Sequence, residues 1–184
     1  MAQMLFVGNG YNAMSVDKIC KMAKVNKGSF YHFFPTKRDL LIAVIEKNWL
    51  DMQGFLFHPA FRTELQPMDR IKHFFELLYT NGQSAKKMFG HAVACPIGMF
   101  GAELDDPVVR KKVDEIFSLF ADFFEKTLRE ARDLGEIDHQ IDISNTAQIL
   151  NAYIQGVLLT TKIKDDLEVI KQLTEGALRL IPKN

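Results

Sequence analysis

Apolar residues recur every three to four positions along most of the chain, the period of a helix with one buried face. The strongest run follows Asp106-Pro107 and continues to Gly135. Clusters of turn residues at the short spacing that separates strands are lacking. The pattern therefore predicts an all-α fold of about nine helices, over residues 1–10, 16–23, 27–32, 37–56, 67–82, 86–104 with a bend, 107–134, 143–163 and 165–180.

Capping residues divide the first part of the chain into short helices. Ser15 and Asn26 are expected N-caps, and Pro35 prevents the second of these helices from continuing. Thr36 is expected to cap the long helix that follows, with Asp39 completing an approximate capping box. Two short helices joined by a tight turn predict a helix-turn-helix, with a core of Val16, Ile19, Ala23, Val25, Phe30 and Phe34.

The formal net charge is zero, but it is unevenly distributed. Residues 1–48 hold seven Lys and Arg against three Asp and Glu, a balance of +4, so the remainder carries −4. A basic segment on an acidic body favours binding to phosphate at one end only. We therefore expect a DNA-binding domain over residues 1–48 and a second helical domain over 49–184, with a loop at 56–66.

Two cysteines are too few for a disulfide framework or a zinc site, which favours a reducing cytoplasm. The first residues lack the basic start and apolar run of an export signal, and no apolar stretch is long enough to span a membrane. We expect a cytoplasmic protein without a metal or cofactor.

The segment from Gly10 to Leu41 resembles the TetR/AcrR family of repressors. The matching positions are Gly10-Tyr11, Ser15, Ile19-Cys20, Ala23, Asn26-Lys27-Gly28, Tyr31, Phe34 and Lys37. Two positions depart from the family pattern: Met14 stands at the capping Thr, and Lys24 stands at the turn Gly. Lys in a left-handed turn costs roughly 1 kcal/mol relative to Gly, which the motif tolerates.

The resemblance implies a homodimeric repressor that is released from a palindromic DNA operator by a small molecule. The second helix of such a motif enters the major groove, while flanking groups hold phosphates. The predicted DNA contacts are Ser15, Asn26, Lys27, Gly28, Ser29, Tyr31, His32 and Lys37. Whether Lys27 pairs with guanine or neutralises phosphate stays open.

Small residues on the last two helices allow the close approach that a four-helix dimer contact requires. They are Ala147, Ala152, Gly156, Gly176 and Ala177. Packing within one chain is the alternative.

The second domain is rich in aromatic and methionine side chains, which suggests a pocket for a hydrophobic or aromatic effector. The expected lining is Met52, Phe55, Phe75, Tyr79, His91, Cys95, Met99, Phe117, Phe120, Phe124 and Tyr153. Ordinary core packing is the alternative for each of them.

The segment from Ala94 to Leu104 resembles a Gly-Cys-x-x-Gly-Asn-Leu-x-x-Glu motif of one TetR subgroup, with Met99 in place of Asn. Some members of that subgroup use the cysteine to sense electrophiles or oxidants. If a helix is intact there, His91 lies one turn before Cys95 and lowers the pKa of its thiol. A thiol-based sensor is therefore an alternative function, and a buried inert thiol is the alternative role of Cys95.

Two further classes of function have less support in the sequence. An enzyme would use His91 and Cys95 as a nucleophilic pair, but the chain offers no orienting third residue, phosphate loop or ligand-spaced cluster. We therefore expect no catalysis. A DNA-binding protein without an effector would not need the aromatic-rich second domain.

Overall fold

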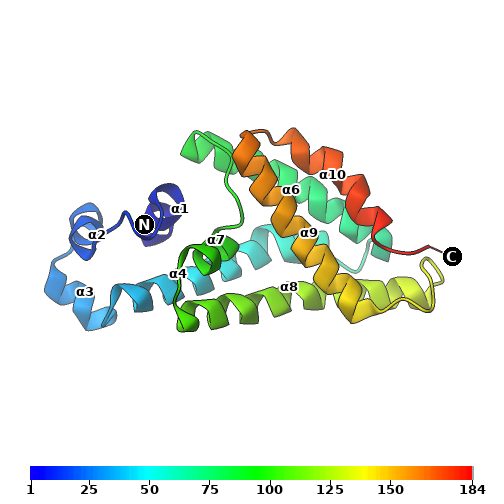
Figure 1. Cartoon of the computed structure of the whole chain (residues 1–184), viewed down its shortest axis with the longest axis horizontal. Coiled ribbons are helices and arrows are strands. Elements are labelled where there is room, and N and C mark those ends of the chain that lie inside the picture. Colours follow the sequence, from blue (N-terminus) through cyan, green and yellow to red (C-terminus); the bar gives the residue numbers. More distant parts are fainter. Residues whose placement is uncertain (184) are drawn as a thin grey trace. The chain divides into compact units, whose positions relative to one another are not determined.

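The computed structural model describes residues 1–183. This part of the chain forms helices and turns without a strand, which confirms the predicted all-α fold (Figure 1). It also contains no helix that is both long enough and apolar enough to cross a membrane.

The chain folds into two compact units. One unit, here called the head, contains Met1–Asp51 and Pro96–Val113. The other, here called the body, contains Met52–Cys95 and the described residues after Val113. The predicted DNA-binding domain, residues 1–48, lies within the head, and the head also includes a segment from the middle of the chain.

The head is built from short helices and the start of longer ones. Its elements are α1 (Ala2–Asn9), α2 (Val16–Ala23), α3 (Lys27–Phe33), α4 (Lys37–Met52, whose last residue belongs to the body), α7 (Pro96–Glu103) and the beginning of α8 (Pro107–Asp133). Thr36 and Asp39 form the predicted capping box at α4, because each side chain accepts a hydrogen bond from the other residue's N–H, at 3.2 and 2.8 Å. The core contains Phe6, Ile19, Phe30, Leu41 and Ile45.

The body contains a π-helical turn η1 (Gln53–Phe57), α5 (His58–Ala60), α6 (Pro67–Phe89), most of α8, α9 (Ile143–Lys164) and α10 (Glu168–Arg179). Helix α10 packs against both α6 and α9 (Figure 1). Five aromatic rings form the centre of the body, with centroids 5.1 to 6.2 Å apart. They belong to Phe57, Phe61, Phe74, Phe123 and Phe124.

The buried guanidinium of Arg70 fixes the loop before α6. It donates to Glu130 at 2.6 Å and to the carbonyls of Leu65 and Thr63 at 2.9 and 3.3 Å. These bonds compensate the burial of a charge and hold the loop against the start of α6.

Gly82 does not end a helix, so the predicted break there is wrong. Helix α6 continues to Phe89 and ends at Gly90, which has a φ of 81°. A Cβ at Gly82 would lie 3.0 Å from Leu167 and 3.7 Å from Ile170. The glycine therefore allows α10 to approach closely, and its helix-propensity cost of about 1 kcal/mol is tolerated in the interior of a long helix.

Three other boundaries also differ from prediction. Residues 86–104 do not form one bent helix, because residues 90–95 are not helical and α7 begins at Pro96, where proline suits the first turn. The last helix starts at Glu168, since Asp165 is the left-handed C-cap of α9. The loop expected from residue 56 starts later, because η1 and α5 extend helical structure to Ala60.

Candidate nucleic-acid interface and effector cavity

The turn between α2 and α3 has the geometry of a helix-turn-helix. Ser15 Oγ accepts a hydrogen bond from Lys18 N at 3.2 Å, and Asn26 Oδ1 accepts one from Ser29 N at 2.7 Å. Both predicted caps are therefore confirmed. Lys24 has a φ of 55° and a ψ of 40°, so it occupies the left-handed position where the family pattern has Gly.

Part of the apolar surface of the two short helices is turned inward, and their polar residues face solvent. Ile19, Cys20 and Phe30 are buried. Val25 is 45% exposed, so its assignment to the core was wrong; the left-handed residue before it turns it outward. Seven of the predicted contact residues are exposed together on this part of the head: Ser15, Asn26, Lys27, Gly28, Ser29, Tyr31 and His32.

Gly28 protects the cap of α3. A Cβ at this position would lie 3.2 Å from Asn26 Oδ1, the oxygen that accepts the capping hydrogen bond. A larger residue would crowd that oxygen. Gly28 therefore keeps the first turn of α3 intact.

Lys27 forms an ion pair with Asp17, with Nζ 2.7 Å from Oδ1. The hydrogen bond to Asp17 raises the pKa of Lys27 above its ordinary value. The lysine is therefore positively charged and is engaged by an acidic side chain when no DNA is bound. Sequence reasoning missed this pair, because the distance between the first turns of two different helices depends on the angle at the turn.

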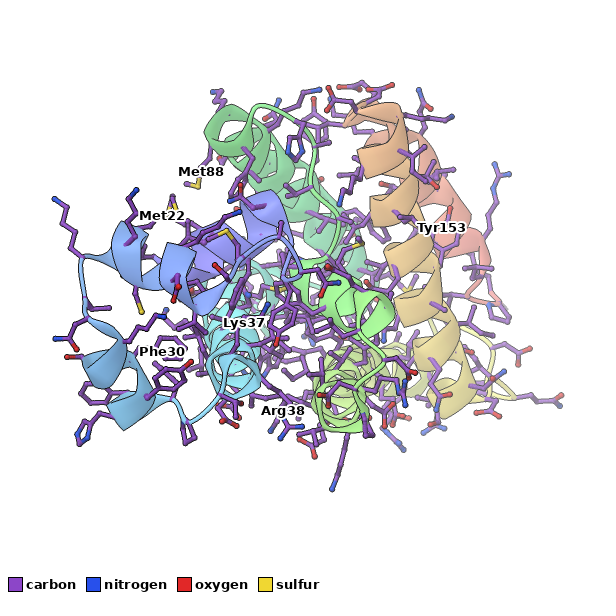
Figure 2. The ribbon with its side chains drawn as sticks, turned by 60° about the vertical axis from the view of Figure 1, so that its left-hand side comes forward. Met22, Phe30, Lys37, Arg38, Met88 and Tyr153 are labelled. Carbon is purple, nitrogen blue, oxygen red and sulfur yellow. The ribbon has the colours of Figure 1, made fainter. Side chains whose placement is uncertain are left out.

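Lys37 lies half-buried at the start of α4, where Figure 2 labels it. Its ammonium donates to the carbonyls of Tyr11 and Met14, at 3.0 Å each, and lies 3.8 Å from the centre of the Tyr11 ring. Burial lowers the pKa of Lys37 below its ordinary value. Lys37 therefore connects the loop between α1 and α2 to α4.

The segment Pro96–Val113 contacts α1, the loop before α2 and α4 within the head. Glu103 Oε1 accepts a hydrogen bond from Asn12 N at 3.3 Å, and Arg38 pairs with Asp106 at 3.4 Å. The Phe100 ring packs edge-on to Phe6 with centroids 6.4 Å apart. The Glu at the end of the subgroup motif thus supports the loop before α2, a role that the sequence did not indicate.

A small, partly open cavity of about 20 Å³ lies in the body, enough for a single water molecule. Its surface is apolar, although two residues with amide side chains, Asn151 and Gln155, are part of the wall. The lining residues are Met52, Leu56, Phe57, Phe74, Leu78, Cys95, Phe120, Phe124, Asn151, Ile154, Gln155 and Leu158.

Four of the eleven predicted pocket residues line this cavity: Met52, Cys95, Phe120 and Phe124. The other seven do not line it. Phe55 and His91 are exposed, Phe75 is buried in the core, and Met99 belongs to the head. The hydroxyl of Tyr79 donates to Glu168, that of Tyr153 donates to the Leu173 carbonyl, and Phe117 lies outside the wall.

His91 and Cys95 are not one helical turn apart, which corrects the geometry expected for a thiol pair. The five residues from His91 to Cys95 are not helical, and His91 Nδ1 lies 3.0 Å from the Ala92 carbonyl oxygen. The thiol of Cys95 is buried at the cavity. The basis for the expected influence of His91 on the thiol is therefore absent.

Among residues 1–183, no three His, Cys, Asp or Glu side chains are grouped so that they could hold a metal ion.

The chain matches two protein-family descriptions, one over its first helices and one over most of the remaining residues. Residues 1–44 match the bacterial regulatory proteins of the tetR family, and residues 67–177 match the tetracyclin repressor-like C-terminal domain.

Known proteins match nearly the whole chain. The HTH-type transcriptional repressor DhaR of Mycobacterium sp. (strain GP1) is 28% identical over 91% of this chain and 82% of its own length. An uncharacterized HTH-type transcriptional regulator of Lactococcus lactis is 27% identical over 92% and 83%. The crystal structure of the regulatory protein TetR from Rhodobacter sphaeroides has a TM-score of 0.84 and 25% identity, and covers 98% of this chain and 94% of that one. This chain therefore belongs to the TetR family of DNA-binding transcriptional regulators.

Proposed function

We propose that the protein is a homodimeric repressor that binds a palindromic operator through α3 and is released by a small, uncharged, apolar molecule. The observation that carries the release step is the apolar cavity in the body. A charged effector would lose its water shell on entering the cavity and would find no charged group on the apolar wall to replace it, which disfavours its binding. The cavity is small, so binding of such a molecule requires the surrounding side chains to separate.

The experiment on release compares two probes of similar size and different charge, toluene and benzoate. The operator is first selected from random DNA duplexes with the purified protein. Toluene is expected to raise the melting temperature and to weaken operator binding, and benzoate is expected to do neither. Ile154→Phe fills the cavity and should remove the response to toluene while DNA binding persists. If toluene and a wider set of apolar molecules change neither quantity, the protein represses without such an effector.

The dimer is proposed to form through α9 and α10. Exposed small and apolar residues follow one face of α9 at helical spacing: Ile149, Ala152, Gly156, Leu159 and Ile163. Ile163 is 75% exposed in the single chain. A second copy of the chain would bury this stripe, and a two-fold dimer would place two α3 helices on two half-sites of a palindrome.

A thiol-sensing function remains the second candidate because Cys95 lines the cavity. A reactive molecule that enters the cavity would meet the buried sulfur. Iodoacetamide should then release the operator from the wild-type protein and leave Cys95→Ser bound. Equal release from both proteins would assign Cys95 to the core.

A further inference from the structure

Phe33 is the most exposed aromatic residue among residues 1–183, and it lies at the end of the helix that reads DNA. The side chain is 72% exposed. Phe30 is buried, and its ring packs against Phe34 with centroids 6.0 Å apart. The Phe33 ring instead meets only the adjacent His32, edge-on at 5.0 Å, among the ring contacts that the structure describes. Phe33 is therefore not part of the core of the head.

The position of Phe33 places it near the predicted base contacts. Ser29 and Phe33 are four residues apart, so they share one side of α3. Ser29 is exposed and its N–H is already used by the Asn26 cap, so the backbone at this end of α3 is satisfied. A helix seated in the major groove through Ser29 would bring the Phe33 ring to the groove one turn further along.

The surroundings of Phe33 select a nucleic acid as the partner that covers it. Four exposed lysines belong to α2, α3 and the turn between them: Lys18, Lys21, Lys24 and Lys27. This concentration of positive charge complements a phosphate backbone. The exposed ring of Phe33, on α3, would be shielded from water when DNA is bound to these helices.

A phenyl ring cannot donate or accept an ordinary hydrogen bond, so it cannot hold a phosphate oxygen. In the major groove the apolar group that distinguishes one base from the others is the C5-methyl of thymine. We infer that Phe33 is a specificity-determining residue that packs on a thymine methyl group in each half-site. This inference rests on the proposed operator binding.

The test uses a DNA duplex selected from a random library with the wild-type protein, and replaces each thymine in turn by deoxyuridine, which lacks only the methyl group. One replacement in each half-site removes two methyl groups and is expected to weaken wild-type binding about 16-fold, about four-fold for each buried carbon group. Phe33→Ala should weaken binding to the thymine duplex by at least this factor and should be insensitive to the same replacement. Phe33→Leu should retain part of the discrimination.

Leu134→Ala is the matched control, because Leu134 is 64% exposed and lies in the body beyond α8. It should bind both duplexes as the wild type does, and melting curves of all variants should coincide. The inference is overturned if Phe33→Ala binds normally, if deoxyuridine affects wild type and Phe33→Ala equally at every position, or if the selected half-site contains no thymine. Failure of the wild-type protein to select any duplex would instead overturn operator binding itself, and the role of Phe33 with it.

Discussion

Asp17, in the first turn of α2, forms an ion pair with Lys27, in the first turn of α3, at 2.7 Å. Both side chains are exposed, so salt screens the pair and its effect on stability is small. If Lys27 contacts DNA as predicted, the acidic partner competes with DNA for the lysine.

Asp17→Asn should therefore tighten binding to DNA, because it frees Lys27 and removes a negative charge near the phosphates. If Lys27 reaches a phosphate, Lys27→Ala should reduce the slope of log affinity against log salt by about one. If it reaches guanine, the loss should be confined to one base position. Fluorescence anisotropy over a range of salt concentrations measures both. Weaker binding by Asp17→Asn would show that the pair orients Lys27 for its contact.

Lys37→Met should lower the free energy of unfolding by about 1.5 to 3 kcal/mol, because hydrogen bonds from a charged donor to two carbonyls are lost. Denaturant unfolding measures this change. The salt slope of DNA binding separates two roles of Lys37. An unchanged slope indicates that it positions the loop before α2, while a slope reduced by about one indicates an additional phosphate contact.

Lys24→Gly should stabilise the protein by about 0.5 to 1 kcal/mol, because glycine adopts the left-handed conformation without the steric cost of a Cβ. The matched variant is Gly135→Ala, at a φ of 75° with open space around it, which should destabilise by a similar amount. Thermal unfolding with a common baseline compares the two. A destabilising Lys24→Gly would mean that the lysine side chain contributes more than the backbone strain removes.

The stability that Asp165 contributes should be lost in acid. Its pKa is held below the ordinary value, first by the hydrogen bond from Ala92 N and then by Lys86, whose Nζ lies 3.0 Å from the carboxylate. A lowered pKa in the folded state means that the stabilisation is complete above the unfolded value, about 3.9, and is lost as the pH falls through the folded pKa. Asp165→Asn keeps an acceptor for Ala92 and tolerates the left-handed backbone. It should melt below the wild type at pH 7, and the difference should shrink below about pH 4. An equal difference at both pH values would exclude the charge as its source.

Leu159→Glu should convert the proposed dimer into monomers, because it places a charge in the exposed stripe of α9. Sedimentation velocity measures the change in mass, and affinity for a palindromic operator should fall with it. Leu134→Glu, an equally drastic change at an exposed leucine outside α9 and α10, should leave the mass unchanged. A dimeric Leu159→Glu would place the interface elsewhere.

Local chemistry determined much of this protein from the sequence alone. Helical periodicity, the caps at Ser15, Asn26 and Thr36, and the stop at Pro35 define the helix-turn-helix, because each depends on residues within one turn of one another. The left-handed role of Lys24 followed from the motif in the same way.

Tertiary packing decided the features that join distant parts of the chain. The sequence predicts a helix end at Gly82, but the structure shows that this glycine lets α10 approach the interior of α6. Lys37 is a predicted phosphate contact, and its hydrogen bonds to two backbone carbonyls add a structural role that the sequence did not indicate. The cavity wall contains residues from 52 to 158, so periodicity could identify which side chains face inward but not which of them meet. The physical reason is that a cap is determined by dihedral angles along a few residues, while a contact between helices depends on their crossing angles and on every side chain between them.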